Sequence, residues 1–202
     1  MKRLRLFSCL LFVTLLSNFA LAQDDDNSMK FITDGDIPIS GFAGPILEMS
    51  DISGDLALSG GVGAGILFYR NFYVGGYGMQ LINDHRYTFR ADSTLTLGYQ
   101  TAGAWLGYLN RSNDIVHIGL STKLGWGNMN FDNRLGNEVE SSNLFLVTPQ
   151  LEIEVNIAPF VKVNFGAGVR LVSGLDDSQF YNDDDFSSPV GSVSLLFGWF
   201  DD

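Results

Sequence analysis

The chain has 202 residues, of which 12 are basic and 23 acidic, giving a formal net charge of −11. So acidic a chain is not expected to bind nucleic acid or anionic lipid headgroups directly. Only 17% of its residues are charged, while 13% are aromatic and 23 are glycine. An ordinary soluble domain has about 25% charged residues and about 7% glycine, so the composition favours a lipid-facing sheet with a tight interior.

Residues 1–22 have the three parts of an export signal. Three basic residues stand among the first five positions, the apolar run Leu6–Leu16 follows, and Ala20-Leu21-Ala22 forms a small-x-small cleavage pattern. A retained membrane anchor would need about 20 apolar residues, so we expect cleavage before Gln23. The remaining 180 residues suit one domain, and their nine basic and 23 acidic residues give a net charge of −14.

Cys9 is the only cysteine of the chain. It lies inside the predicted signal and away from the cleavage point, which argues against a lipid-anchored protein. The mature chain would have no thiol, hence no disulfide and no cysteine nucleophile. With two histidines and no mature cysteine, we expect no transition-metal site and no cofactor.

After an acidic N-terminal segment at residues 23–38, which shows no clear periodicity, hydrophobicity alternates with period two. A tilted membrane strand needs about 9–11 residues, and eight runs reach or exceed this length. They are Ile39–Met49, Asp55–Tyr69, Phe72–Ile82, Thr94–Leu109, Ile115–Gly127, Leu144–Ile157, Phe160–Ser173 and Pro189–Phe200.

The alternation is clearest in the last four runs. In Ile115–Gly127 the even positions are mostly apolar, whereas the odd positions include His117, Ser121 and Lys123. The polar faces of the next two runs include Glu152, Glu154, Lys162 and Arg170. A water-soluble sandwich would alternate in the same way, so other features must decide.

The links between the runs differ in length. The links after runs two, four and six are short: Arg70-Asn71, Asn110–Asp114 and Ala158-Pro159. Those after runs three, five and seven are long and polar: Asn83–Ser93, Asn128–Asn143 and Gly174–Ser188. The first link, Ser50–Gly54, is intermediate. Short turns at one end and longer loops at the other are typical of outer-membrane barrels, whose even strand number leaves no unpaired edge.

Aromatic residues gather beside the short links. They are Phe68, Tyr69, Phe72, Tyr73, Tyr108, Phe160 and the pair Trp199-Phe200. This placement predicts an aromatic girdle at the periplasmic interface. Four further aromatic residues are predicted to serve the opposite rim, namely Tyr87, Trp126, Phe131 and Phe145.

In this organisation, residues Ile39 to Phe200 resemble the small outer-membrane barrels of Gram-negative bacteria, the OmpA/OmpX-like class. The resemblance implies an all-β fold, an eight-stranded antiparallel up-and-down transmembrane β-barrel over residues 39–202. It further implies an outer-membrane location with both termini in the periplasm. We expect a monomer surrounded by outer-membrane lipid.

An eight-stranded barrel is just wide enough for its own side chains to fill it, so inward charges should pair. If Ala158-Pro159 makes a tight turn, Glu154 lies roughly opposite Lys162. We therefore predict a lumen charge network of Lys123, Glu152, Glu154, Lys162, Arg170 and His117. The alternative is a gated polar path or a proton relay, and the many inward glycines argue for a tight lumen.

The two histidines are the candidate catalytic bases. His117 shares a face with Ser121, and His85 lies in a predicted loop beside Asp84 and Arg86. An outer-membrane protease or acyl-transfer enzyme would use such a histidine with Ser or Asp. No recognised spacing is present, so we favour a histidine that fills the lumen and a solvated loop histidine.

The acidic loop is the most unusual local feature, with carboxylates at Asp176, Asp177, Asp183, Asp184 and Asp185. Oxygen ligands at short spacing suit hard cations such as Ca²⁺, which would bridge the loop to anionic surface polysaccharide. The spacing of a defined calcium loop is missing, so we favour a solvated loop.

Taken together, these features favour a non-enzymatic outer-membrane barrel with a structural or surface-interaction role through its outward loops. Three alternatives stay open. They are a narrow pore for small solutes, an outer-membrane enzyme acting on lipid or peptide, and a soluble periplasmic barrel with a ligand cavity.

Overall fold

The computed structural model describes residues 38–83, 85–90, 93–132, 138–175 and 182–200. The predicted export signal and nearly all of the acidic segment lie outside these ranges. The strands are β1 Ile39–Ile52, β2 Asp55–Phe68, β3 Phe72–Leu81, β4 His85–Arg90, β5 Ser93–Asn110, β6 Val116–Asp132, β7 Glu138–Ala158, β8 Val161–Ser173 and β9 Ser188–Gly198, with one short helix, α2 Asp183–Phe186.

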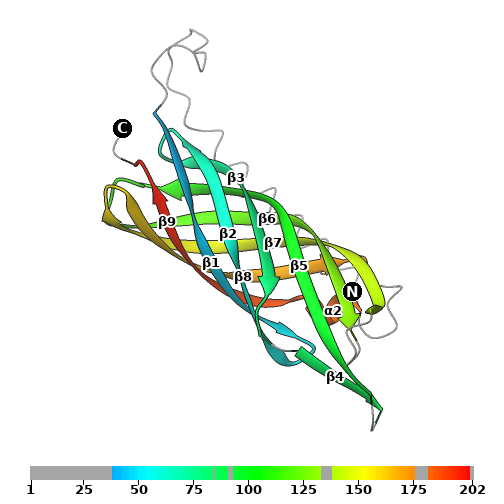
Figure 1. Cartoon of the computed structure of the whole chain (residues 1–202). Helices are drawn as coiled ribbons and strands as arrows, with labels where there is room; N and C mark the ends of the chain where they lie inside the picture. The colour runs from blue at the N-terminus through cyan, green and yellow to red at the C-terminus, as the bar shows by residue number, and fades with distance from the viewer. Residues whose placement is uncertain (1–37, 84, 91–92, 133–137, 176–181, 201–202) are drawn as a thin grey trace, which may run out of the picture. The chain divides into compact units, whose positions relative to one another are not determined.

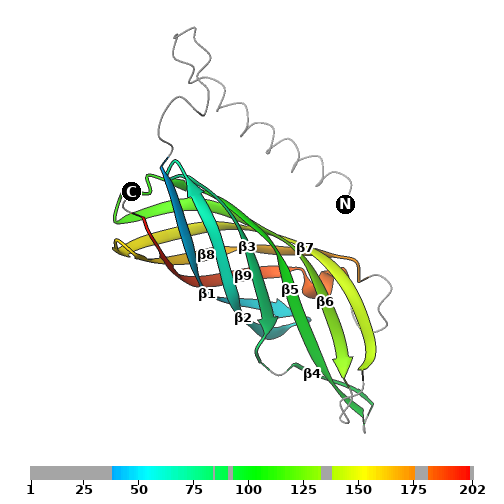
Figure 2. The ribbon, with the colours of Figure 1, turned by 45° about the horizontal axis from the view of Figure 1, so that its top comes forward.

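The strands form one closed antiparallel sheet (Figures 1 and 2). Their order is β3-β2-β1-β9-β8-β7-β6-β5-β4, and β3 also pairs with β5, which closes the ring. β3 and β4 pair with successive parts of β5, so together they count as one of the eight strands of the barrel. The predicted eight-stranded up-and-down barrel is therefore confirmed.

The outer face of the wall is apolar, whereas the charged side chains of the strands point inward, where they share the interior with buried apolar side chains such as Ile46 and Trp105. Outward residues such as Leu56, Val62 and Leu120 are 61–66% exposed, whereas the inward Glu152 and Arg170 are each 2% exposed. Alternating strand residues point to opposite faces, so the period-two pattern predicted this division. Backbone groups in a closed sheet are satisfied within the wall, as a bilayer requires.

Tight turns connect the strands at both ends. At the end of the barrel away from Ile39 and Gly198, Ser53 and Gly54 have φ of 55° and 92° and join β1 to β2 directly. Positive φ at both central residues is typical of two-residue hairpins, so the intermediate link predicted at Ser50–Gly54 was wrong. At the other end, Tyr69 and Arg70 also have positive φ.

In two of the three predicted long loops, Asn83–Ser93 and Asn128–Asn143, most of the described residues are strand. β6 continues to Asp132 and β7 begins at Glu138, while β4 occupies His85–Arg90. The prediction failed because these hairpins extend beyond the apolar band, where the outward positions become polar, as at Asn128 and Asn130, and the inward positions become apolar, as at Met129 and Phe131. Backbone pairing nevertheless continues, for example between Asn130 and Ser141. Figure 1 shows the β4–β5 hairpin extending past the neighbouring strands.

Helix α2 covers the interior at this same end. Asn182 caps it, with its side chain accepting from Asp184 N at 2.9 Å, in a reciprocal capping box with Asp185. Phe186 is fully buried, and its ring lies 5.6 Å from that of Tyr99. Within the described ranges, no helix is long and apolar enough to cross a membrane.

Most of the aromatic residues near the short turns lie on the outer face, as predicted. Phe72 is 55%, Phe160 61% and Trp199 60% exposed. Three placements were wrong. Tyr73, predicted for the girdle, is 4% exposed, and Phe131, predicted for the opposite rim, is fully buried, because both occupy inward positions of their strands. Phe200, predicted for the girdle, packs against the buried core. The side chain of Tyr87 lies outside the described residues.

Candidate functional site

The barrel interior has an apolar half and a polar half. Strands β1 to β5 contribute an aromatic cluster in which Phe42, Tyr73 and Trp105 meet edge to face, with ring centroids 5.3–5.7 Å apart. Strands β6 to β9 contribute most of the buried polar side chains, from His117 to Ser194. The apolar half therefore packs against the charged half inside one narrow wall.

Inward glycines on β2 make room for the aromatic cluster. A Cβ on Gly63 would lie 2.8 Å from Ile46 Cδ1 and 3.0 Å from the Trp105 ring, and one on Gly65 would lie 2.8 Å from Phe42 Cζ. Real Cβ atoms do not approach so closely, so these positions require glycine while the cluster keeps its packing. Close packing explains the glycine-rich run of this strand.

The charged side chains form three groups along the lumen. In the group nearest α2, Glu48 accepts from Lys123 Nζ at 2.8 Å and from Arg170 Nη2 at 2.5 Å. All three side chains are at most 5% exposed. The guanidinium of Arg170 also lies 5.5 Å from the Tyr99 ring centre. One carboxylate therefore holds two cations.

The middle group is centred on Glu152, whose partners are neutral. Its carboxylate accepts from Ser121 Oγ at 2.5 Å, Asn164 Nδ2 at 2.9 Å and Tyr73 Oη at 3.1 Å. Three donors from three strands satisfy this buried carboxylate by hydrogen bonding.

The group nearest the short turns is centred on Glu154. Its Oε1 lies 2.8 Å from Lys162 Nζ and 3.0 Å from His117 Nε2. The other ring nitrogen of His117 lies 3.1 Å from the carbonyl oxygen of Asp114. Lys162 Nζ also stands 4.4 Å from the ring centre of Phe200, which covers this end of the lumen.

Charge inside the described wall is balanced, and space is scarce. Three carboxylates face three basic side chains, with His117 in addition. Two cavities inside the wall, one beside Glu48 and one beside Trp105, have volumes of about 10 Å³ each. A single water needs about 10–15 Å³, so neither cavity admits a solute. A depression of about 460 Å³ opens only at the short-turn end, beside Arg70 and Phe200.

All six side chains of the predicted lumen network are buried inside the barrel. The structure brings Glu154, Lys162 and His117 together, and it joins Lys123 to Arg170 through Glu48. Glu48 was missed because β1 carries large apolar residues on both faces, which hides its alternation. The signal that could have identified Glu48 is that it is the only charged residue in the predicted membrane strand Ile39–Met49.

The described residues give no support to a catalytic pair. Ser121 donates to Glu152, while the ring of His117 is engaged by Glu154 and by the Asp114 carbonyl. His85 belongs to β4 instead of a loop, and its side chain lies outside the description.

The acidic loop is only partly described, since Asp176 and Asp177 lie outside the described ranges. Asp183 accepts from Leu175 N at 2.8 Å, and Asp185 accepts from Asn182 N at 3.0 Å. These two carboxylates stabilise α2 and its flanks. Among the described residues, no group of three His, Cys, Asp or Glu side chains is placed to hold a metal. A cation-binding loop at Asp176, Asp177 and Asp183–Asp185 therefore stays a prediction.

Comparison with known proteins supports the fold. No family model and no curated protein matches the chain. Neisserial surface protein A aligns with a TM-score of 0.57 and 12% identity, over 82% of this chain and 99% of that one. Ail of Yersinia pestis, solved with the heparin analogue sucrose octasulfate, aligns with a TM-score of 0.46 and 17% identity, over 80% of this chain and 97% of that one. The chain has the fold of the small eight-stranded outer-membrane β-barrels.

Proposed function

We propose that the chain is a non-enzymatic outer-membrane protein that spans the bilayer as a closed barrel. Its function would be exerted by the strand extensions at the end opposite Ile39 and Gly198, the first and last residues of the barrel strands. The observation that carries the proposal is the combination of an apolar outer face with a lumen filled by its own paired charges.

The outer face supports the membrane location. Large apolar side chains are exposed on β1 to β3 and on β6 to β9, including Val62, Leu120, Leu151 and Phe165 at 48–66%. A soluble monomer rarely exposes so large a continuous apolar surface. In a bilayer the same surface is covered by acyl chains.

The lumen argues against the narrow pore and against the soluble ligand-binding barrel. An ion or solute would have to displace Glu48 from Lys123 and Arg170, or pass the aromatic cluster around Trp105. A soluble ligand-binding barrel would need a polar outer face and a cavity, whereas here Val62 and Leu120 are 66% and 61% exposed on the outer face and the two cavities beside Glu48 and Trp105 measure about 10 Å³ each.

The surface-interaction role is assigned to the hairpins that continue beyond the apolar band. β4 with β5 and β6 with β7 form paired ribbons there. A paired ribbon is a preorganised binding surface, because little backbone order is lost on contact. Since the mature chain is acidic, an anionic polysaccharide would be held only through divalent cations.

Two measurements test the proposal. The outer-membrane fraction, run on a gel with and without boiling in SDS, should show a band that shifts on heating. Orientation is tested by cysteine labelling in a Cys9→Ser background, which leaves no other thiol. A membrane-impermeant maleimide added to intact cells should label Ser141→Cys in the β7 extension but not Asn113→Cys in a short turn. An unshifted soluble protein would refute the barrel, and the reverse labelling pattern would refute the orientation.

A further inference from the structure

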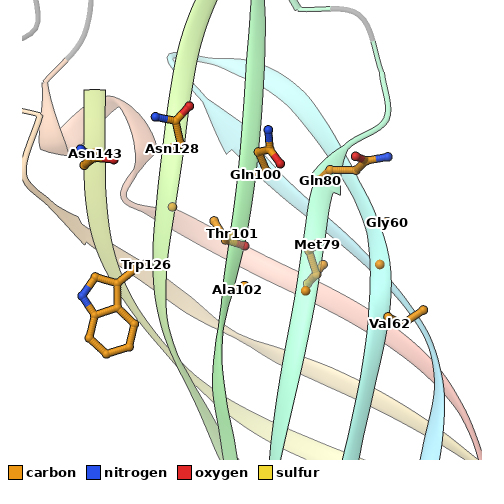
Figure 3. Close-up of a pocket in the computed structure, with 13 residues that line it drawn as sticks. Gly60, Val62, Met79, Gln80, Gln100, Thr101, Ala102, Trp126, Asn128 and Asn143 are labelled. Atoms are coloured by element: carbon orange, nitrogen blue, oxygen red, sulfur yellow. The ribbon is translucent and has the colours of Figure 1, made fainter. Parts of the chain in front are cut away.

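A row of four neutral amide side chains crosses the outer face of the barrel. In the sheet register Gln80 lies opposite Gln100, Gln100 opposite Asn128, and Asn128 opposite Asn143. The row therefore spans β3, β5, β6 and β7, and Figure 3 shows the four side chains along the upper part of this wall. Gln80, Gln100 and Asn143 are exposed, while Asn128 Nδ2 donates to Ser141 Oγ at 3.0 Å.

The height of the row on the barrel places it near the outer edge of the apolar band. Tyr108, in the aromatic girdle, and Gln100 stand eight residues apart on β5. With a rise of about 3.4 Å per residue and a strand tilt of about 40°, this separation is about 20 Å along the barrel axis. The apolar band of such barrels is about 25 Å tall. Gln100 therefore lies near the level where lipid headgroups meet acyl chains. Because the register row runs at right angles to tilted strands, the heights of its members are spread over about 9 Å from Gln80 to Asn143.

Next to the amides, on the side of the girdle, the wall is hollowed into a groove of about 590 Å³ (Figure 3). Four residues that lie opposite one another on neighbouring strands explain the shape of the groove. Val62 and Trp126 stand at the two sides of the groove, and the small residues Gly78 and Ala102 lie between them. Val62 is 66% and Trp126 68% exposed, so both project from the wall. β2 and β6 are three strand spacings apart, about 14 Å, which leaves the width of an acyl chain between the two side chains.

We propose that this groove binds an acyl chain of an outer-leaflet glycolipid, and that the amide row hydrogen-bonds the carbonyl and hydroxyl groups where that chain joins its sugar. The inference rests on the membrane location proposed above. The chemistry changes along the groove as it does along such a lipid, from neutral polar groups at the edge to small apolar residues below. Amides both donate and accept, which suits carbonyls and hydroxyls, and the acidic chain offers no general attraction to phosphate.

A second copy of the chain fits the groove less well. In a two-fold dimer the same patch meets itself, so the hollow at Gly78 and Ala102 would face an identical hollow. The interface would enclose a void whose lining loses its packing contacts. A flexible chain fills the hollow without this loss.

Glycine substitutions test the groove without disturbing the fold. A Cβ on Gly78 meets no atom within 4 Å, so Gly78→Leu should fill the groove and leave the wall intact. The matched control is Gly191→Leu, at an outward position of β9 that is equally open. The double variant Gln80→Leu/Gln100→Leu removes two amides at similar side-chain size.

The measurement is native mass spectrometry of the full chain, purified from the outer membrane and mixed in detergent with equal amounts of a diglucosamine glycolipid and phosphatidylethanolamine. The wild type and Gly191→Leu should retain the glycolipid. Gly78→Leu should reduce the retained fraction at least about fivefold, which corresponds to about 1 kcal/mol. The double amide variant should lose the preference for glycolipid over phosphatidylethanolamine.

Three results would overturn the proposal: equal retention by Gly78→Leu and the wild type, equal retention of both lipids by the wild type, or a dimer that Gly78→Leu abolishes. The band shift on heating is measured on the same samples. A shifting band without glycolipid retention refutes the groove alone, whereas loss of the shift in the wild type refutes the membrane barrel itself.

Discussion

Replacing Glu48 by Gln is the sharpest test of the buried charge network. Glu48 is 4% exposed and is the shared partner of Lys123 and Arg170. Gln keeps the size of the side chain but leaves two buried cations facing one neutral oxygen. Removing one partner of a buried ion pair typically costs about 3–5 kcal/mol, and we expect the free energy of unfolding to fall by that amount.

The assay is urea unfolding of the barrel in lipid vesicles, followed by the heat-shifted band. The slope with urea should stay constant while the midpoint falls, since the surface exposed on unfolding is unchanged. Asp55→Asn, the same chemical change at an exposed position next to the outer turn, is the matched control and should shift stability by no more than about 0.5 kcal/mol. Adding Lys123→Met to Glu48→Gln removes one of the uncompensated cations, so the double variant should cost about 1–3 kcal/mol less than the sum of the single variants.

Two outcomes would contradict this reasoning. If Glu48→Gln loses less than about 1 kcal/mol, water must solvate Lys123 and Arg170, and the lumen is not dry. If the double variant costs the full sum, Glu48 and Lys123 do not interact. Either outcome would also revive the narrow pore, because a hydrated lumen is the condition for conduction.

Three further predictions concern the wall and the lumen. Gly63→Ala should lower stability by about 1–3 kcal/mol through overpacking against Ile46 and Trp105, whereas Gly78→Ala should be nearly neutral in the same urea assay. Leu124→Arg, halfway between girdle and amide row, should cost about 2–4 kcal/mol, and Leu120→Arg beside the girdle about 0–1 kcal/mol; equal costs would contradict the membrane depth assigned here. The wild type should show no stepwise conductance in planar bilayers, and discrete steps would refute the closed lumen.

Strand number, pairing order and the inward charged residues other than Glu48 were predictable from the sequence. In β6 to β9 one face is almost entirely polar, so a shift of register by one residue would expose charge to lipid. This constraint makes the period-two signal strong in the strands that carry Lys123, Glu154 and Arg170. Among the described residues, the same strands hold five of the six buried inward residues with formal charge.

The strand extensions were not predictable because their physical environment differs. Beyond the amide row the alternation is reversed: Met129 and Phe131 on the inner face are fully buried and apolar, whereas Asn128 and Asn130 occupy the outward positions. These ribbons are held together by backbone hydrogen bonds between strands, which do not depend on residue type and so cannot be predicted from the side chains. The residue type also gave no signal for the tight turn at Ser53, because a residue other than glycine adopts a φ of 55° there.

Which inward charged side chains contact one another could not be predicted from the sequence, for a different reason. A period-two pattern gives the face of each side chain but not its height, which depends on the stagger between strands around the closed ring. Lys162 was expected opposite Glu154, yet its backbone partner is Asn156, and the ion pair forms because the long lysine side chain spans the offset. Glu48 reaches Lys123 across the lumen from β1 to β6, strands that do not touch in the sheet. Such contacts exist only once the barrel has closed, so the closed fold, and not any local run of residues, selects which charges meet.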